Sequence, residues 1–391
     1  MSSLQHILER LESGRVRTVG LKGAARGWVL SRLRKERNAP LLCVTADEDA
    51  AEALFDDLSF FFGGPHSGRV VLLPGDDALP WDELVPDSPT VAERLGTLFK
   101  LRTGAAIDAV VLPARGLSRK VLPPDVMATL SREVTKADEL GRDGLARLLT
   151  DMGYRHSPLV EDQGSYSLRG DIIDVFPPLT TRPVRLEFFG DSIESMREFD
   201  PDSQRTLEET SHLTLLPARE LFFSEKTRAA AEATLRRLGD EANLPTAQVR
   251  EKIERIREGL SPGGLEGLMP GFWGTLASLF DYLPHWHPTP LVYVDDAVAT
   301  TRALEEFDSE SERSYREAVA RGELVLPPKD HHLSRAEVLA ALTRFPTVEG
   351  GALSLEAVDA RPPLAFTFGE TKELRESIKS HHGEEGALTP L

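Results

Sequence analysis

The sequence has a single cysteine and no long apolar run. Cys43 lies in the apolar stretch 41–44, and one cysteine can form neither a disulfide nor a multi-cysteine zinc site within the chain. No stretch approaches the roughly 18 apolar residues that a membrane-spanning helix needs. Residues 1–16 have the pattern of an amphipathic helix and lack the apolar core of a signal peptide. We therefore expect a cytoplasmic protein without disulfides.

Positive charge is also scarce. The chain has 46 lysine and arginine residues against 63 aspartate and glutamate residues, which gives a net charge of -17. A protein that grips DNA phosphates along a broad face needs the opposite balance. We therefore expect that this chain does not rely on nucleic acid for its affinity, although the balance leaves room for a local basic groove. The length of 391 residues and the 40% hydrophobic content predict two or three globular domains.

Short apolar segments alternate with helical patterns over the first third of the chain. The strand-like runs are 17–20, 40–45, 70–73 and 109–112, and the helical patterns are 24–33, 46–59 and 88–103. This alternation predicts an α/β fold with a parallel sheet that helices cover on both faces.

The pattern changes after about residue 122. A helical run at 140–152 precedes short alternating runs separated by turns, at 164–169, 171–176, 183–189, 192–199 and 214–217. These runs predict a small α+β domain with antiparallel strands. Beyond it, 224–259 is strongly helical, and a buried strand at 290–295 precedes a helix that extends to about residue 307.

We accordingly divide the chain into four parts. Residues 1–123 form a first lobe, 124–217 the α+β domain, 218–326 a second part of the main module, and 327–391 a linker and the start of a truncated further domain. Residues 383–391 provide no strand or helix cap, which suggests that the chain continues in a longer protein.

A degenerate phosphate loop lies between the first strand and the helix after it. A working loop has the pattern G-x-x-x-x-G-K-[ST], whose lysine neutralises phosphate charge and whose hydroxyl holds magnesium. The segment begins with Gly20 and Gly23, but Ala25, Arg26 and Gly27 stand where the second glycine, the lysine and the hydroxyl residue belong. We expect no ATP binding here, no cofactor and no catalytic residue.

Other reactive patterns are weaker. Asp295 and Asp296 follow the strand at 290–295, where an acidic pair either completes a nucleotide site or simply caps a helix. The sequence contains neither an H-E-x-x-H nor a G-x-S-x-G motif. His285 and His287 flank Trp286 among prolines, which favours a turn over a metal site. We predict no metal.

The segment 183–189 is the most informative strand. Its even-numbered residues are apolar and should face a core, whereas Arg185, Glu187 and Phe189 share the other face. A phenylalanine beside charged residues suits a docking surface, in which the apolar ring anchors the partner and the polar groups orient it. Alternatively, a helix of the same domain covers Phe189.

A second arginine belongs near this strand. Arg169 precedes a turn at Gly170 and could join Arg185 in a small positive patch that steers an acidic partner protein. The alternative is that both arginines form ion pairs within the domain, with Asp171 or Asp174.

Three segments carry a family resemblance. Residues 164–177, 185–195 and 199–206 resemble the module shared by UvrB and the Mfd family of bacterial transcription-repair coupling factors, and weaker similarity extends over about 15–310. Two departures favour the N-terminal, UvrB-homology region of the Mfd family. One is the degenerate phosphate loop. The other is the short distance from 74–82 to the helix start at 88–90, which leaves no room for the DNA-clamping hairpin of UvrB.

The resemblance implies degenerate RecA-like lobes that have lost their ATPase activity, with an inserted α+β domain that binds UvrA. Family residues that contact UvrA fall on Arg169, Arg185 and Phe189. In the intact family member, this region also restrains the motor by packing on the C-terminal domain, and contacts with RNA polymerase and DNA belong to downstream domains. The main alternative is an ATP-dependent, UvrB-like damage-verification enzyme that binds the nucleotide through Lys22 or Arg26. A purely autoinhibitory scaffold is a third reading.

Overall fold

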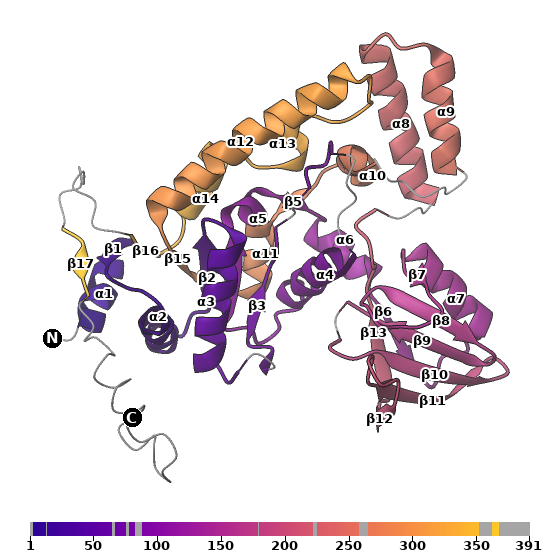
Figure 1. The fold of residues 1–391 in the computed structure, drawn as a ribbon, viewed down its shortest axis with the longest axis horizontal. Coiled ribbons are helices and arrows are strands. Elements are labelled where there is room, and N and C mark those ends of the chain that lie inside the picture. The colour runs from indigo at the N-terminus through magenta and orange to yellow at the C-terminus, as the bar shows by residue number, and fades with distance from the viewer. Residues whose placement is uncertain are drawn as a thin grey trace.

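The computed structural model describes residues 3–12, 14–64, 67–75, 78–82, 88–178, 180–221, 225–257, 265–351 and 362–366. Figure 1 shows an elongated molecule, with a large parallel sheet and its helices at one end and a smaller antiparallel domain at the other. In the described part of the chain, no helix is both long and apolar enough to cross a membrane.

The large sheet has seven strands, all parallel, in the order β17-β1-β16-β15-β2-β4-β3. Its strands are β1 (Arg15–Val19), β2 (Leu41–Thr45), β3 (Val70–Leu72), β4 (Ala109–Pro113), β15 (Leu291–Val294), β16 (Thr347–Glu349) and β17 (Leu364–Ala365). β2, β4 and β15 are buried along their whole length, as continuous apolar runs in a doubly covered parallel sheet should be. The predicted α/β class is confirmed.

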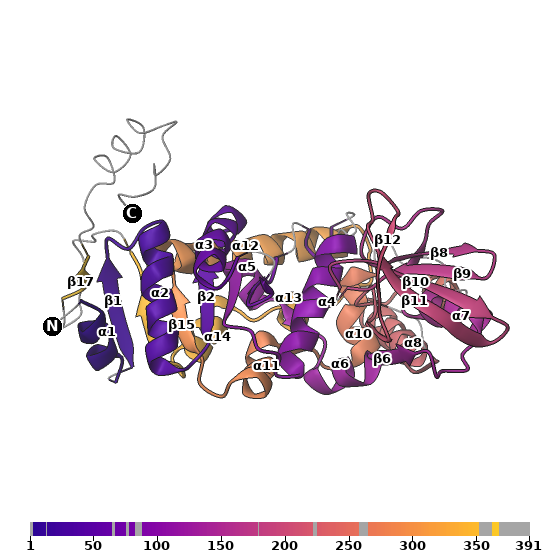
Figure 2. The same cartoon turned by 90° about the horizontal axis from the view of Figure 1, so that it is seen from below.

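Helices cover both faces of this sheet (Figure 2). One face packs on α1 (Ser3–Leu11), α2 (Ala24–Arg37) and α3 (Glu48–Phe61), and the other on α4 (Ser88–Arg102), α5 (Ala114–Ser118), α11 (Leu279–Trp286), α12 (Ala297–Ala320) and α14 (Arg335–Leu342). Successive residues of a strand serve opposite faces, so Leu41 and Cys43 join the first core and Leu42 and Val44 the second.

The segment after residue 326 differs from our expectation of a linker. Residues 328–349 form α13 (Pro328–His331), α14 and β16, and β16 lies between β1 and β15 in the middle of the large sheet. A strand with two hydrogen-bonded neighbours is integral to its sheet, and this part of the chain contributes to both cores: Val348 of β16 packs in the first, and Val338 and Leu342 of α14 pack in the second. Of the residues beyond it, only 362–366 are described, and the boundaries of our four predicted domains remain predictions.

The smaller domain contains a six-stranded sheet in the order β12-β11-β10-β9-β8-β7, in which only β7 and β8 run parallel. The strands are β7 (Arg155–His156), β8 (Ser165–Arg169), β9 (Ile172–Phe176), β10 (Val184–Phe189), β11 (Ser192–Phe199) and β12 (Thr206–Glu209). α7 (Arg142–Asp151) packs on one face, and β6 (Arg132–Thr135) pairs with β13 (His212–Leu215) beside it. The predicted α+β arrangement is confirmed, but β12 was missed because all four of its residues are exposed and show no alternation.

The remaining elements connect the two sheets. They are β5 (Lys120–Val121) paired with β14 (Ala277–Ser278), α6 (Pro124–Leu130), α8 (Glu225–Glu241), α9 (Thr246–Arg257), a 3-10 turn (Glu266–Leu268) and α10 (Met269–Trp273). The helical region predicted as one run at 224–259 is a hairpin of α8 and α9. The chain reverses at Asn243, whose φ of 52° is left-handed, and Pro245 favours the start of the second helix. Residues 261–264, whose proline and two glycines predict a break after the helical region, lie outside the described residues.

A buried ion-pair cluster ties the smaller domain to the large sheet. Glu220, just past β13, accepts hydrogen bonds from Arg94 of α4 at 3.0 Å and from Arg119 at 2.6 Å. Burial disfavours the charged carboxylate, but the two guanidinium groups outweigh burial and lower the pKa of Glu220 to about 2. A charged, fully paired Glu220 therefore links α4, the end of α5 and the end of the smaller domain.

Two neighbouring histidines are also buried, at the end of α13. His331 ends α13 with Nε2 3.1 Å from the carbonyl oxygen of Gly267, and the ring of His332 packs 4.8 Å from that of Phe307. Burial lowers the pKa of His331 from 6.5 to about 3 and that of His332 in the same direction. Both side chains are therefore neutral at pH 7, and protonating them requires local opening of this core.

These histidines should make the free energy of unfolding fall on mild acidification. The folded pKa of His331 lies below its unfolded value, so its contribution is complete above about pH 6.5 and declines as pH falls toward 3. Between pH 7 and pH 5 this residue alone should cost about 2 kcal/mol. Glu220, whose window is 4.5 to about 2, adds little there. Urea unfolding at both pH values measures the loss, and a His331→Gln chain that loses as much as the parent would contradict this assignment.

Candidate functional site

The smaller sheet has one covered face and one open face. Leu186 and Phe188 of β10 pack with Leu145 and Leu149 of α7 in a common core, as the alternation predicted. Arg185, Glu187 and Phe189 belong to the opposite face, which is open to solvent at several positions. Strand periodicity therefore separates the stabilising side of β10 from the side available to a partner.

Phe189 is the most exposed large apolar side chain among the described residues, at 80% of its surface. It lies at the end of β10, opposite Ser192 on β11, beside the turn at Gly190. The alternative in which a helix of the same domain covers Phe189 is wrong for the part of the chain that the structure describes. An aromatic ring held on a regular strand with this exposure is suited to insertion into a pocket of another protein.

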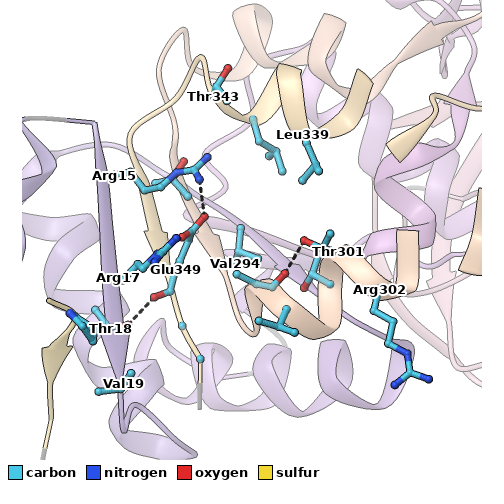
Figure 3. Close-up of a pocket in the computed structure, with 18 of the residues that line it drawn as sticks. Arg15, Arg17, Thr18, Val19, Val294, Thr301, Arg302, Leu339, Thr343 and Glu349 are labelled. Carbon is cyan, nitrogen blue, oxygen red and sulfur yellow. Dashed lines mark hydrogen bonds and ion pairs between the residues drawn. The ribbon is translucent and has the colours of Figure 1, made fainter. Parts of the chain in front are cut away.

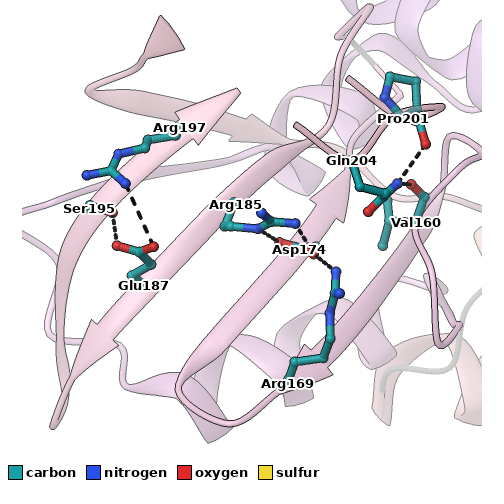
Figure 4. A network of polar contacts seen from close by, with 9 residues as sticks. All are labelled: Val160, Arg169, Asp174, Arg185, Glu187, Ser195, Arg197, Pro201 and Gln204. Carbon is teal, nitrogen blue, oxygen red and sulfur yellow. Dashed lines mark hydrogen bonds and ion pairs between the residues drawn. The ribbon is translucent and has the colours of Figure 1, made fainter. Parts of the chain in front are cut away.

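The structure brings Arg169 and Arg185 together around one carboxylate (Figure 4). Arg185 donates from Nε to Oδ1 of Asp174 at 2.7 Å and from Nη2 to Oδ2 at 3.0 Å. Arg169 donates from Nη2 to the same Oδ2. The expected positive patch is therefore present, but the alternative of ion pairing within the domain also holds, through Asp174. The side chain of Arg169 remains 47% exposed and that of Arg185 18%.

The guanidinium group of Arg185 also lies over the aromatic ring of Phe199. Its guanidinium carbon lies 4.7 Å from the centre of the Phe199 ring, and Phe199 is buried with Val160 and Phe176 in a small cluster on this face. The hydrogen bonds to Asp174 raise the pKa of Arg185 above its ordinary value. Arg185 is thus a fixed, permanently charged group.

Sequence reasoning placed Glu187 on the open face but missed its two polar neighbours there, Ser195 and Arg197. Glu187 accepts a hydrogen bond from Ser195 at 2.6 Å and lies 3.9 Å from Arg197, which is opposite Arg185 on β11 (Figure 4). The register between β10 and β11 shifts between Glu187 and Phe188. Strict alternation along 192–199 would therefore have assigned part of β11 to the wrong face, which hid Arg197 from the sequence analysis.

The degenerate phosphate loop leads from β1 into α2. A Cβ at Gly20, whose φ is +85°, would lie 2.2 Å from the backbone oxygen of Phe366, so Phe366, the residue after β17, packs closely against the start of the loop. A Cβ at Gly27 would lie 2.9 Å from the backbone oxygen of Asp57. Gly27, which stands where a magnesium-binding hydroxyl belongs, thus permits close packing of α2 on α3. Gly23 is the N-cap of α2 and makes no side-chain cap hydrogen bond, and Ala25 lies in the first turn of this helix.

Arg26 is an internal ion-pair residue. Its guanidinium group lies 2.9 Å from Asp57 of α3 and 2.7 Å from Asp295, which follows β15. Tyr293 also donates a hydrogen bond to Asp295 at 2.9 Å. Burial disfavours the charged form of Arg26, but the two carboxylates outweigh burial and raise its pKa. The positive charge of Arg26 is therefore balanced by two carboxylates of the same chain. The expectation of a helix cap holds for Asp296, which accepts from two backbone amides of α12, but not for Asp295.

An open cavity of about 760 Å³ lies on the other face of β1 and β16, between these strands and α12 and α14. Figure 3 shows Arg15 and Arg17 pointing toward Glu349, with Leu339 and Thr343 on the facing wall. Glu349 pairs with Arg15 at 3.2 Å and with Arg17 at 3.4 Å. The cavity therefore lies across the sheet from the helix that follows the degenerate loop, and it does not restore a phosphate site.

Comparison with known proteins places these features in a family context. The sequence profile of the UvrB interaction domain matches residues 133–221, the part that contains the open sheet face. The transcription-repair-coupling factor of Myxococcus xanthus is 51% identical over 391 residues, which covers 98% of this chain and 32% of the relative. That of Escherichia coli (strain K12) is 31% identical over 371 residues, which covers 91% of this chain and 30% of the relative. The chain spans about a third of the length of these relatives.

Proposed function

The chain belongs to the family of the transcription-repair-coupling factors, and from this premise we propose that its smaller domain recruits UvrA in transcription-coupled nucleotide excision repair. The observation that carries the proposal is the open sheet face, on which an exposed Phe189 shares a surface with the paired arginines Arg169 and Arg185. This face lies within the residues that match the UvrB interaction domain.

The chemistry of this face suits a specific protein partner. A rigid aromatic anchor supplies apolar area with little loss of conformational freedom, and burying it in a partner pocket is worth about 2 kcal/mol or more. Guanidinium groups form charge-assisted, directional hydrogen bonds to carboxylates and steer an acidic surface during encounter. Phe189 would fill a pocket of UvrA while Arg169 and Arg185 bond to acidic side chains.

Calorimetric titration of purified UvrA onto the chain tests the proposal. We expect saturable binding whose affinity falls with increasing salt, because the arginines contribute electrostatic attraction to an acidic partner. A Phe60→Ala chain is a matched control, since Phe60 is 77% exposed but lies on α3, outside the smaller domain, and it should bind like the parent. Absence of binding by the parent would contradict docking and favour the scaffold reading.

We further propose that this chain has no ATPase activity of its own. Arg26, one of the two candidate nucleotide ligands, is neutralised by Asp57 and Asp295, and two carboxylates at that position would repel phosphate. The rival function, an ATP-dependent UvrB-like damage-verification enzyme, predicts DNA-stimulated hydrolysis. We expect no phosphate release at high protein concentration, with or without DNA. Hydrolysis that disappears in a Lys22→Ala or Arg26→Ala chain would support the rival.

In an intact family member, we propose that the same open face packs on the C-terminal domain and so restrains the downstream motor. Contacts with RNA polymerase and DNA would then belong to segments beyond this chain. The UvrA titration repeated on an intact family member should give weaker binding than this chain gives, because the face is partly masked. Equal affinity would contradict masking of this face.

A further inference from the structure

We propose that Asp174 is a positioning residue of the docking surface, whose buried carboxylate holds Arg169 and Arg185 in the arrangement that a partner recognises. The inference rests on the proposed UvrA docking and adds to it a residue that does not itself touch the partner. In this proposal, the buried carboxylate of Asp174 orients both arginines.

The strand register places Asp174 at the centre of the open face. It is on β9, paired with Ser167 of β8 on one side and with Arg185 of β10 on the other. Arg169 is two residues further along β8 and reaches back diagonally to the same carboxylate. One acidic side chain on the middle strand thus connects the two flanking strands that carry the arginines (Figure 4).

Burial makes this carboxylate unusual for an exposed sheet face. The side chain of Asp174 has no exposed surface, while its partners Arg169 and Arg185 remain 47% and 18% exposed. A buried carboxylate is costly without partners, so Asp174 strongly favours conformations in which both guanidinium groups approach it. Because Arg185 binds in a two-point fork and also stacks on Phe199, its plane is set by two independent contacts.

Pre-organisation should matter more here than charge. The trio of Arg169, Arg185 and Asp174 has two positive charges and one negative, so removing the carboxylate raises the local charge from +1 to +2. If charge alone governed affinity for an acidic partner, losing Asp174 would speed association and strengthen binding. If positioning governs affinity, the same change releases two long side chains, and the complex dissociates faster. The two roles therefore predict opposite signs.

The test measures association and dissociation rates of UvrA on the parent chain and on Asp174→Asn and Asp174→Glu chains. Asparagine keeps the shape but removes the charge, and glutamate keeps the charge but displaces the carboxylate by one methylene. We expect both variants to weaken binding by about tenfold or more through faster dissociation, in line with the effect of losing a supporting residue. Asp138→Asn is the control, because Asp138 pairs with Arg132 in the same domain and does not contact the docking arginines.

Coupling between residues separates positioning from a merely structural role. In a chain that already carries Arg169→Ala and Arg185→Ala, Asp174→Asn should change the residual UvrA affinity by less than about twofold, because no arginine is left to position. A folded Asp174→Glu chain from which UvrA dissociates at the parent rate would overturn the proposal. If the Asp174→Asn chain does not fold, the Asp174→Glu chain alone decides the test. UvrA binding by the parent chain and by the Asp138→Asn chain separates failure of this proposal from failure of the docking function. If neither chain bound UvrA, the docking function itself would be contradicted.

Discussion

A chain in which Arg169, Arg185 and Phe189 are all replaced by alanine should lose at least about a hundredfold in UvrA affinity. Truncation of Phe189 alone should cost about 2 kcal/mol, or roughly thirtyfold, because its ring is 80% exposed in the chain and would be buried in the complex. The arginine changes add to this loss by removing both directional donors. Their individual effects should not be additive, since both arginines bond to Asp174.

Two observations make this variant interpretable. The three side chains lie on the open face, so the apolar core between β10 and α7 is untouched, and loss of the arginines opens Asp174 to water. Leu207→Ala is the matched control, because Leu207 is 45% exposed on β12 of the same sheet and is not part of the proposed surface. Unchanged UvrA affinity in a triple variant that melts as one cooperative unit would exclude this face as the docking site.

Replacing Arg26 with alanine should lower the free energy of unfolding by about 3–5 kcal/mol. The change leaves the carboxylates of Asp57 and Asp295 close together without their shared cation, between α2, α3 and the end of β15. Lysine at this position should recover only part of the loss, since a single ammonium group cannot reproduce two directed guanidinium contacts. Urea unfolding at pH 7 measures both variants.

A matched arginine on the same helix serves as the control for Arg26. Arg32 pairs with Glu36 at 3.7 Å on the exposed side of α2, and an alanine there should cost less than about 1 kcal/mol. If Arg26→Ala were as mild as Arg32→Ala, the internal ion cluster would not be structural, and Arg26 would again be available as a nucleotide ligand. A large loss would instead mean that Arg26 has a structural role, although it stands at the position where a motor protein has its phosphate-binding lysine.

The organisation of the fold followed from local patterns to a considerable extent. Continuous apolar runs at 40–45 and 290–295 predicted buried parallel strands, and β2 and β15 lie side by side in the sheet with Leu41 opposite Leu291. Alternation along 183–189 separated the core residues from Arg185 and Phe189. These features were predictable because the side-chain period of a strand is a local property of the backbone.

Three features were not predictable from local patterns. β16 has only three residues, too few for a periodic signal, yet it is an interior strand of the large sheet, between β1 and β15. β12 is exposed throughout and carries no alternation. The β-bulge between β10 and β11 changes the face to which Arg197 belongs, and a register shift leaves no mark in the composition of a strand.

By itself, the sequence determined the α/β class, the small antiparallel domain, the degenerate loop and the residues Arg169, Arg185 and Phe189 as candidates for docking. Only the tertiary structure decided that Phe189 is exposed, that Asp174 pairs with both docking arginines, and that Arg26 forms ion pairs with Asp57 and Asp295. The reason is physical. Hydrophobic periodicity reports which face of an element is buried, whereas an ion pair between residues hundreds of positions apart depends on how the elements meet in space.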